Sequence, residues 1–229
     1  MSERPLVSCI VPAHNAARYL SQALHSIFRQ TYDRTEVIVV DDGSTDETAR
    51  VIEGHGSKVR ALRQANAGPA AARNAGVECA RGEFVAFLDA DDLWHPAKLA
   101  RQMECFQQEP GLDLCFAHMR NFWSPEVPSD RRPGGPELLI AWPGRNCSAL
   151  VARRSAFARV GPFNPALPVG EDGDWLLRGA EAGLRRRTLP GVLVFRRLHE
   201  HNLSRRMHRE SQDALLGRLK AHLDRGRDV

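Results

Sequence analysis

The stretch "TEVIVVDDGSTDETARVIEGHG", residues 35–56, contains the two kinds of segment from which the fold can be predicted. Its first half is short, apolar and β-branched, which is typical of a strand buried on both faces, and it ends on Asp41 and Asp42. Its second half begins with Ser, Thr and Asp residues suited to capping a helix and stops at glycine. A buried strand followed directly by a helix is the repeating unit of a parallel sheet.

The same alternation extends in both directions along the chain. Further strands are predicted over residues 6–14, 59–64, 83–92, 112–123 and 191–198, and a strand leading into a short helix over 147–163. Helices are predicted over residues 17–30, 45–56, 68–82, 95–110 and 171–187, with a long Pro- and Gly-rich loop over 124–146. We therefore predict an α/β fold, a single domain over 1–229 with a mostly parallel central sheet flanked by helices.

Composition limits the class of protein. The chain has 229 residues, of which 42% are hydrophobic and 26% charged, and this is typical of a soluble globular protein. No run approaches the roughly 20 apolar residues that cross a bilayer, and no signal-peptide pattern is present, so a cytoplasmic location is expected. The five cysteines are scattered without a C-x-x-C pair, which argues against a disulfide framework and a zinc site and predicts reduced, mostly buried thiols.

Polar residues follow several of the predicted strands at the point where each strand ends. His14 and Asn15 follow the first, Asp41 and Asp42 the second, and "DADD" at 89–92 the fourth. Ligands of parallel sheets bind at the carboxyl ends of the strands, so these side chains are expected to meet at one edge. A D-x-D pair there can place oxygens on a hard cation that binds a diphosphate, although a turn in which Asp92 caps the next helix is the alternative. We assign Asp92 to turn and capping chemistry.

Two later segments add candidate groups. "GEDGDW", residues 170–175, places Asp172 and Asp174 at the start of a helix, where acids either stabilise the helix dipole or deprotonate an acceptor hydroxyl. "RLHEHNLS", residues 197–204, offers His199 and His201. Neither G-x-G-x-x-G nor a P-loop sequence occurs, which excludes the usual dinucleotide and P-loop sites.

The segments 8–48, 66–96, 170–184 and 197–204 together resemble the family 2 glycosyltransferases, which have the GT-A fold. The resemblance implies a metal-dependent, inverting, hexosyltransferase-like enzyme that transfers a single sugar from a nucleoside-diphosphate donor, often UDP-linked, to an acceptor hydroxyl, with Mn²⁺ or Mg²⁺ as cofactor. It also implies a nucleotide-sugar binding half over about 1–110 and an acceptor and catalytic half over about 111–205. The spacing of leucines at 215, 216, 219 and 223 predicts a C-terminal helical tail over 206–229.

Roles for individual residues follow from the resemblance. The donor-binding positions that it implies are Pro12, Ala13, His14 and Asn15 along the nucleotide, Asp42 at the base, Arg73 near base or phosphate, and Asp89 and Ala90 in the D-x-D turn. The metal ligands that it implies are Asp89, Asp91 and His199. The catalytic base is Asp172, with Asp174 as the second candidate.

Two other functions remain open at this stage. A nucleotidyltransferase acting on sugar phosphates would use a related sheet, and a non-catalytic nucleotide-sugar binding protein would keep the donor site alone. The acceptor could be a saccharide, a lipid-linked molecule or a small molecule, and the sequence does not give the oligomeric state. The net charge of +4 gathers in late arginines, which suit phosphate-bearing partners or a weak contact with anionic lipid; without interleaved aromatic residues, nucleic-acid binding is not expected.

Overall fold

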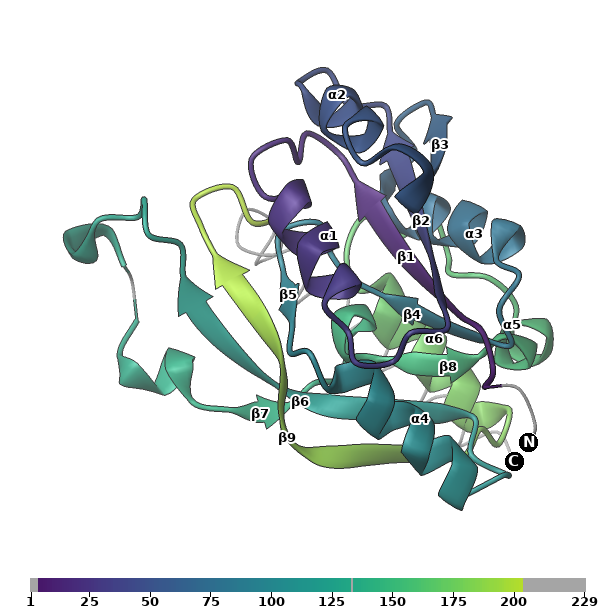
Figure 1. The fold of residues 1–229 in the computed structure, drawn as a ribbon. Helices are drawn as coiled ribbons and strands as arrows, with labels where there is room; N and C mark the ends of the chain where they lie inside the picture. Colours follow the sequence, from purple (N-terminus) through teal and green to yellow (C-terminus); the bar gives the residue numbers. More distant parts are fainter. Residues whose placement is uncertain (1–3, 133, 204–229) are drawn as a thin grey trace.

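A computed structural model describes residues 4–132 and 134–203, and the helix expected over 206–229 lies outside these residues. The strands are β1 (Val7–Ala13), β2 (Thr35–Asp42), β3 (Arg60–Gln64), β4 (Phe84–Phe87), β5 (Leu93–Trp94), β6 (Leu114–Trp123), β7 (Trp142–Pro143), β8 (Val151–Arg153) and β9 (Arg186–Leu198). They form one sheet in the order β3-β2-β1-β4-β8-β6-β9-β5, with β7 paired to β6 (Figure 1).

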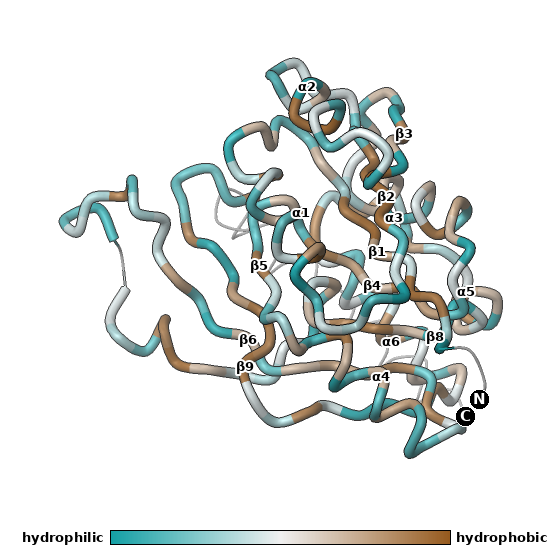
Figure 2. The backbone as a smooth tube through the Cα atoms, in the orientation of Figure 1, coloured by the Kyte–Doolittle hydropathy of each residue, from teal (hydrophilic) through white to brown (hydrophobic). Residues whose placement is uncertain are grey.

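Helices cover both faces of this sheet. The α-helices are α1 (Leu20–Phe28), α2 (Thr48–Glu53), α3 (Gly68–Cys79), α4 (Lys98–Gln108), α5 (Arg154–Val160) and α6 (Glu171–Glu181), and the short 3-10 helices are η1 (Gly56–Lys58), η2 (Ser129–Arg131), η3 (Pro136–Leu139) and η4 (Cys147–Ala149). Because side chains alternate along a strand, Cys9 and Val11 of β1 pack toward α1, α2 and α4, whereas Ile10 packs toward α3, α5 and α6. Figure 2 shows the hydrophobic residues concentrated on the inner strands β1 and β2.

The predicted α/β fold with a mostly parallel sheet is confirmed. β1 pairs in parallel with both β2 and β4, β2 pairs in parallel with β3, and β6 forms the longest parallel pair with β9. Antiparallel pairs of two or three residues join β8, β5 and β7 to this framework.

Two predicted strands have different bounds. The run 83–92 is a strand only as far as Phe87, after which the chain turns through the acidic residues. The last strand begins at Arg186 rather than at 191. Its register with β6 shifts between Leu189 and Val192, so that Pro190 and Gly191 lie in a bulge inside the strand and do not mark its beginning. Pro and Gly are typical of such a bulge, which interrupts the hydrogen-bond ladder without ending the strand.

Residues 124–146 are more ordered than the predicted loop, since they contain η2, η3 and β7. All five cysteines are free, four of them buried, as expected. Within the described residues, no helix combines the length and apolar character that a membrane span requires.

Candidate functional site

The carboxyl ends of β1 and β2 are joined by side-chain hydrogen bonds. Asn15, at a positive φ of 48°, accepts from the backbone N–H groups of Thr45 (2.8 Å) and Asp46 (3.3 Å) through its Oδ1. His14 contacts the backbone oxygen of Asp42 through Nδ1 at 2.8 Å. His14 and Asn15 are exposed at this edge, while Pro12 is half-buried and Ala13 is buried. The structure therefore brings the predicted nucleotide-binding segment of β1 beside the acidic end of β2.

Asp42 is almost inaccessible. Its side chain accepts hydrogen bonds from Gln64 Nε2 (2.8 Å) and from the backbone N–H groups of Ala67 and Gly68 (2.9 Å each), so three of its roughly four acceptor positions are occupied. Gly43, at φ +70°, allows this approach, because a Cβ there would lie 2.7 Å from the backbone nitrogen of Asn66. Asp42 therefore holds the turn before α3, and its contact with a base stays a prediction.

The three aspartates after β4 have three different partners. Asp89 accepts from Arg73 Nη2 at 2.7 Å, whereas Asp91 lies 2.9 Å from His199 Nε2 through its Oδ2. Asp92 is buried and accepts from the backbone N–H of Arg197 at 3.0 Å, and burial, together with the charges of Asp91 and Asp89, raises its pKa well above the usual value. The backbone N–H of Asp92 donates to the backbone oxygen of Asp89 at 3.0 Å, as expected of a turn. The chain continues into β5 and not into a helix, so the predicted capping role of Asp92 is wrong. Through the hydrogen bond from Arg197, Asp92 instead attaches the turn after β4 to strand β9.

The Asp91–His199 contact belongs to a small cluster in which His199 and Asn202 are buried and Asp91 is half-buried. Asn202 donates to Asp91 Oδ2 (3.1 Å) and accepts from the backbone N–H of His199 (2.7 Å). The backbone N–H of His201 points to His199 Nδ1 at 3.2 Å, which places the ring proton on Nε2, facing Asp91. A cation at Nε2 would have to replace that proton. Asp91 and His199 lie together as predicted, and His201 contributes its backbone N–H and a ring that lies 6.4 Å from the His199 ring between centroids.

The predicted third metal ligand, Asp89, is directed toward Arg73. Across residues 4–132 and 134–203, no three His, Cys, Asp or Glu side chains are grouped so as to hold a metal ion. Asp91 and His199 nevertheless supply one oxygen and one nitrogen donor, and Mg²⁺ and Mn²⁺ often take only one or two protein ligands, completing their shell with substrate phosphates and water. The two side chains are therefore compatible with a cation held jointly with a diphosphate.

Arg73 connects two acidic segments that are distant in the sequence. Its guanidinium is buried, with Nη2 on Asp89 and Nη1 in a close ion pair with Glu171. Glu171 is itself 6% exposed and was not assigned a role from the sequence, although it stands beside Asp172 in the quoted motif. No local pattern indicates a partner 98 residues away. This buried ion pair fixes the start of α6 beside the turn after β4.

Asp172 and Asp174 differ in their surroundings. Asp174 forms an ion pair with Arg178 one turn along α6, with Nε and Nη2 both 2.9 Å from Oδ2. Among the residues that the structure describes, only the N–H of Gly173 donates to the Asp172 carboxylate, at 2.7 Å. Burial and the charge of Glu171 raise the pKa of Asp172 to about 6, against the opposing effect of Arg73. Asp172 is therefore the carboxylate whose surroundings suit proton transfer near neutral pH.

A second group missed from the sequence supports the Asp91 turn. Arg197 is buried between the rings of Tyr19 and Phe122, with its guanidinium carbon 4.7 and 4.8 Å from their centroids. Its Nε donates to the backbone oxygen of Asp91 at 2.9 Å, and Nη2 donates to Gln22 at 2.7 Å. In the sequence, Arg197 is one of the late arginines that make up the positive charge. Only the pairing of β9 with its neighbouring strands brings Arg197 to the turn that contains Asp91.

Solved structures identify the class of the fold. The TarS fragment 1–349 from S. aureus, in complex with UDP-GlcNAc, superposes with a TM-score of 0.70 at 24% identity, covering 86% of this chain and 59% of that chain. The mannosyltransferase PcManGT from Pyrobaculum calidifontis, in complex with GDP-Man and Mn²⁺, gives a TM-score of 0.67 at 23% identity, covering 88% and 59%. The chain has the GT-A glycosyltransferase fold.

Sequence comparison gives the family. The model for glycosyl transferase family 2 matches residues 8–155, and an uncharacterized glycosyltransferase from Nostoc sp. is 35% identical over 212 residues, or 86% of this chain and 66% of that protein. The putative teichuronic acid biosynthesis glycosyltransferase TuaG from Bacillus subtilis is 36% identical over 140 residues, covering 59% and 55%. The chain belongs to glycosyl transferase family 2, and it spans about two thirds or less of the length of these relatives.

Proposed function

We propose that this protein transfers a single sugar from a nucleoside-diphosphate donor to an acceptor hydroxyl, with inversion at the anomeric carbon. The observation that carries the proposal is Asp172, a half-buried carboxylate with a pKa of about 6, held beside the carboxyl edge of the sheet by the adjacent Arg73–Glu171 ion pair. Family membership and the GT-A fold support the same activity.

The chemistry asked of Asp172 is general base catalysis. Above a pH of about 6 the carboxylate is ionised and can accept the proton of the acceptor hydroxyl as its oxygen attacks the anomeric carbon. The attack comes from the face opposite the diphosphate, and this in-line geometry inverts the anomeric centre. Asp174 cannot serve as well, because its carboxylate is already paired with Arg178.

Donor binding falls to the edge formed by β1, β2 and β4. We assign the segment Pro12–Asn15 and Asp42 to the nucleoside side, and Asp89 with Ala90 to the diphosphate side. Arg73 holds Asp89 in place, and its buried positive charge also attracts the diphosphate. A divalent cation, when bound, would be held by Asp91 and His199 and would neutralise the leaving diphosphate. UDP-linked donors are the first to test, since the resemblance to family 2 glycosyltransferases most often implies them.

The test is an assay of nucleoside diphosphate release from a set of nucleotide sugars, with Asp172→Asn beside the wild type. We expect Asp172→Asn to lower turnover by about 10²–10⁴-fold while donor affinity stays unchanged. Asp174→Asn is the matched control on the same helix turn and should retain most of the turnover. Comparable turnover by the wild type and Asp172→Asn would refute the assignment of the base.

The products separate this proposal from its alternatives. Pyrophosphate in place of nucleoside diphosphate would indicate a nucleotidyltransferase. Tight donor binding without slow hydrolysis, with every acceptor tried, would indicate a non-catalytic binding protein. The anomeric configuration of the product, determined by NMR, tests inversion directly.

A further inference from the structure

Three consecutive aliphatic side chains are exposed at the end of η3. Leu138, Leu139 and Ile140 are 36%, 41% and 64% exposed, and within the described residues the only other large hydrophobic side chain exposed to this degree is Leu203, at 45%. Single exposed leucines are common on protein surfaces, but several adjacent ones are typical of a surface that binds a partner or a membrane. In Figure 1 this part of the chain projects from the body of the molecule beyond the β6–β9 pair.

The exposure is built into the backbone. Asn121, which is 7% exposed, donates through Nδ2 to the backbone oxygen of Leu138 at 2.7 Å. Two residues beyond Ile140, β7 pairs with β6, and the N–H of Gly144 donates to the oxygen of Ala117 at 3.0 Å. The segment is therefore tied to β6 on both sides of the three aliphatic residues, which fixes its backbone at the surface.

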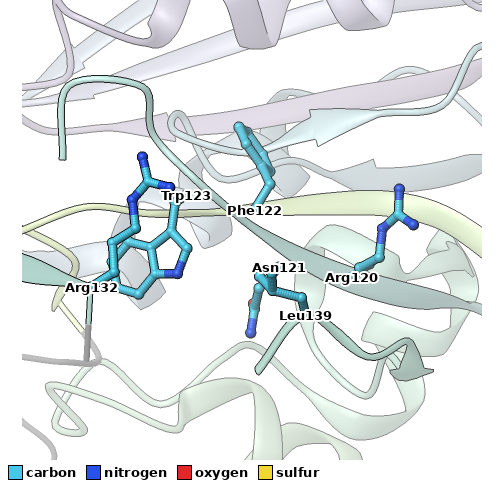
Figure 3. Close-up of a pocket in the computed structure, with 6 residues that line it drawn as sticks. All are labelled: Arg120, Asn121, Phe122, Trp123, Arg132 and Leu139. Carbon is cyan, nitrogen blue, oxygen red and sulfur yellow. The ribbon is translucent and has the colours of Figure 1, made fainter. Parts of the chain in front are cut away.

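Cationic and aromatic side chains border the same segment. A cavity of about 340 Å³ between β6 and this segment is lined by Arg120, Asn121, Phe122, Trp123, Arg132 and Leu139 (Figure 3). Arg131 is also exposed here and forms an ion pair with Glu200 at 3.7 Å, and the carboxylates nearby in the sequence are Asp130 and Glu137. Glu137 is occupied by the N–H of Gly135 at 2.8 Å. We call the surface formed by Arg120, Trp123, Arg132 and residues 138–140 the arginine–leucine face.

We propose that the arginine–leucine face docks on a bilayer that contains anionic phospholipids. Aliphatic side chains enter the acyl boundary, guanidinium groups bind phosphate, and an indole prefers the interface between them. A second copy of the chain fits less well, because a two-fold contact would place the same arginines against one another. An acidic protein partner would account for the arginines but would leave the three aliphatic side chains without an apolar surface.

Docking in this way has a consequence for the site. Trp123 pairs with Leu198, the residue before His199, and the N–H of Ser124 donates to Leu198 at 3.0 Å. The arginine–leucine face and the Asp91–His199 cluster thus share the ends of β6 and β9, and docking would bring that edge of the sheet to the membrane surface. The inference goes beyond the proposed activity and holds whether or not transfer is found.

The test is co-sedimentation of the full chain with vesicles of phosphatidylcholine alone or mixed with phosphatidylglycerol. The wild type should bind the mixed vesicles and not the neutral ones, and added salt should weaken binding. The double variant Leu139→Ser/Ile140→Ser should lower the partition coefficient by about tenfold or more, and Arg120→Gln/Arg132→Gln by about thirtyfold. Arg50→Gln removes an exposed charge on α2, which lies away from this face in Figure 1, and should bind like the wild type.

Three results would overturn the proposal. The first is a wild type that does not bind the mixed vesicles. The second is a Leu139→Ser/Ile140→Ser variant that binds as the wild type does, which would assign binding to the arginines near the C-terminus. The third is a dimer in light scattering that this variant dissociates, which would make a second copy the occupant. Circular dichroism of each variant confirms that the fold is kept.

Discussion

Lys98 is an ionisable group in the hydrophobic core, and no carboxylate of the described residues forms an ion pair with it. It begins α4 at 0% exposure, and Nζ has no hydrogen-bond partner among the described residues. The ammonium lies 4.1 Å from the centroid of the Trp94 ring, and Cys9 and Cys115 are the titratable groups that act on it. Burial lowers the pKa of Lys98 from 10.5 to about 7, against the effect of the two cysteines.

We predict that Lys98→Met stabilises the protein, since methionine keeps the volume and removes the charge. A pKa lowered from 10.5 to about 7 corresponds, at 1.36 kcal/mol per unit, to at most about 5 kcal/mol. The pKa shift expresses the net effect of all interactions on the charged form, so a gain of up to about 5 kcal/mol in the free energy of unfolding is expected near pH 6.

The gain should depend on pH with a definite sign. Below about pH 7 both the folded and unfolded chains carry the Lys98 proton, and the full penalty is present. Above it the unfolded chain binds more protons than the folded one, so the stability of the wild type rises with pH and the advantage of Lys98→Met shrinks. From about pH 6 to about pH 8 the advantage should fall by about 1.4 kcal/mol.

The assay is urea denaturation of both proteins across that range. The pH is kept below about 8 because burial raises the pKa of Cys9 to about 12 in the folded protein. At higher pH this cysteine would ionise in the unfolded chain alone, and the resulting loss of stability would oppose the gain that comes from deprotonation of Lys98. Lys58→Met is the matched control, since Lys58 is exposed and also lies over an aromatic ring, that of Phe28, at 5.9 Å. The prediction is refuted if Lys98→Met is less stable than the wild type, or if the difference in the free energy of unfolding between the two proteins is the same at every pH.

Three further outcomes are expected at the site. The rate of transfer at low substrate should rise with pH and level off above about 6, because Asp172 must be ionised to act as the base; a profile unaffected by pH from about 5 to 7 would contradict this. Arg73→Gln should destabilise the fold by about 3 kcal/mol in urea denaturation, since it leaves the buried carboxylate of Glu171 unpaired, whereas Arg50→Gln at the exposed pair with Glu47 should change stability by less than about 0.5 kcal/mol. Mn²⁺ should tighten donor binding in calorimetry and Asp91→Ala should abolish that gain; equal affinity in a chelator would exclude the cation role.

Local patterns in the sequence determined the secondary structure and the edge that carries the site. Apolar β-branched runs produced β1, β2 and β4, and helical spacing produced the helices between them, because both signals act over a few residues. His14, Asp42 and Asp89 fall at the ends of parallel strands, so their shared edge follows from strand direction alone. The choice between Asp172 and Asp174 did not follow, since both occupy the first turn of one helix and differ only in their neighbours.

The tertiary structure decided how the carboxylates are partnered. Asp89, Asp91 and Asp92 read alike in the sequence, yet one pairs with Arg73, one with His199 and one with a backbone N–H of β9. Arg73 lies on α3, 16 residues before Asp89, whereas the partners of Asp91 and Asp92 lie 108 and 105 residues away, at or just after the end of β9. No short-range pattern encodes these contacts, because they form only when α3 and β9 pack beside the turn after β4. The sequence by itself therefore determined where the acidic edge lies, and the packing of α6 and β9 against that edge decided which carboxylate is buried, which is paired and which is left to accept a proton.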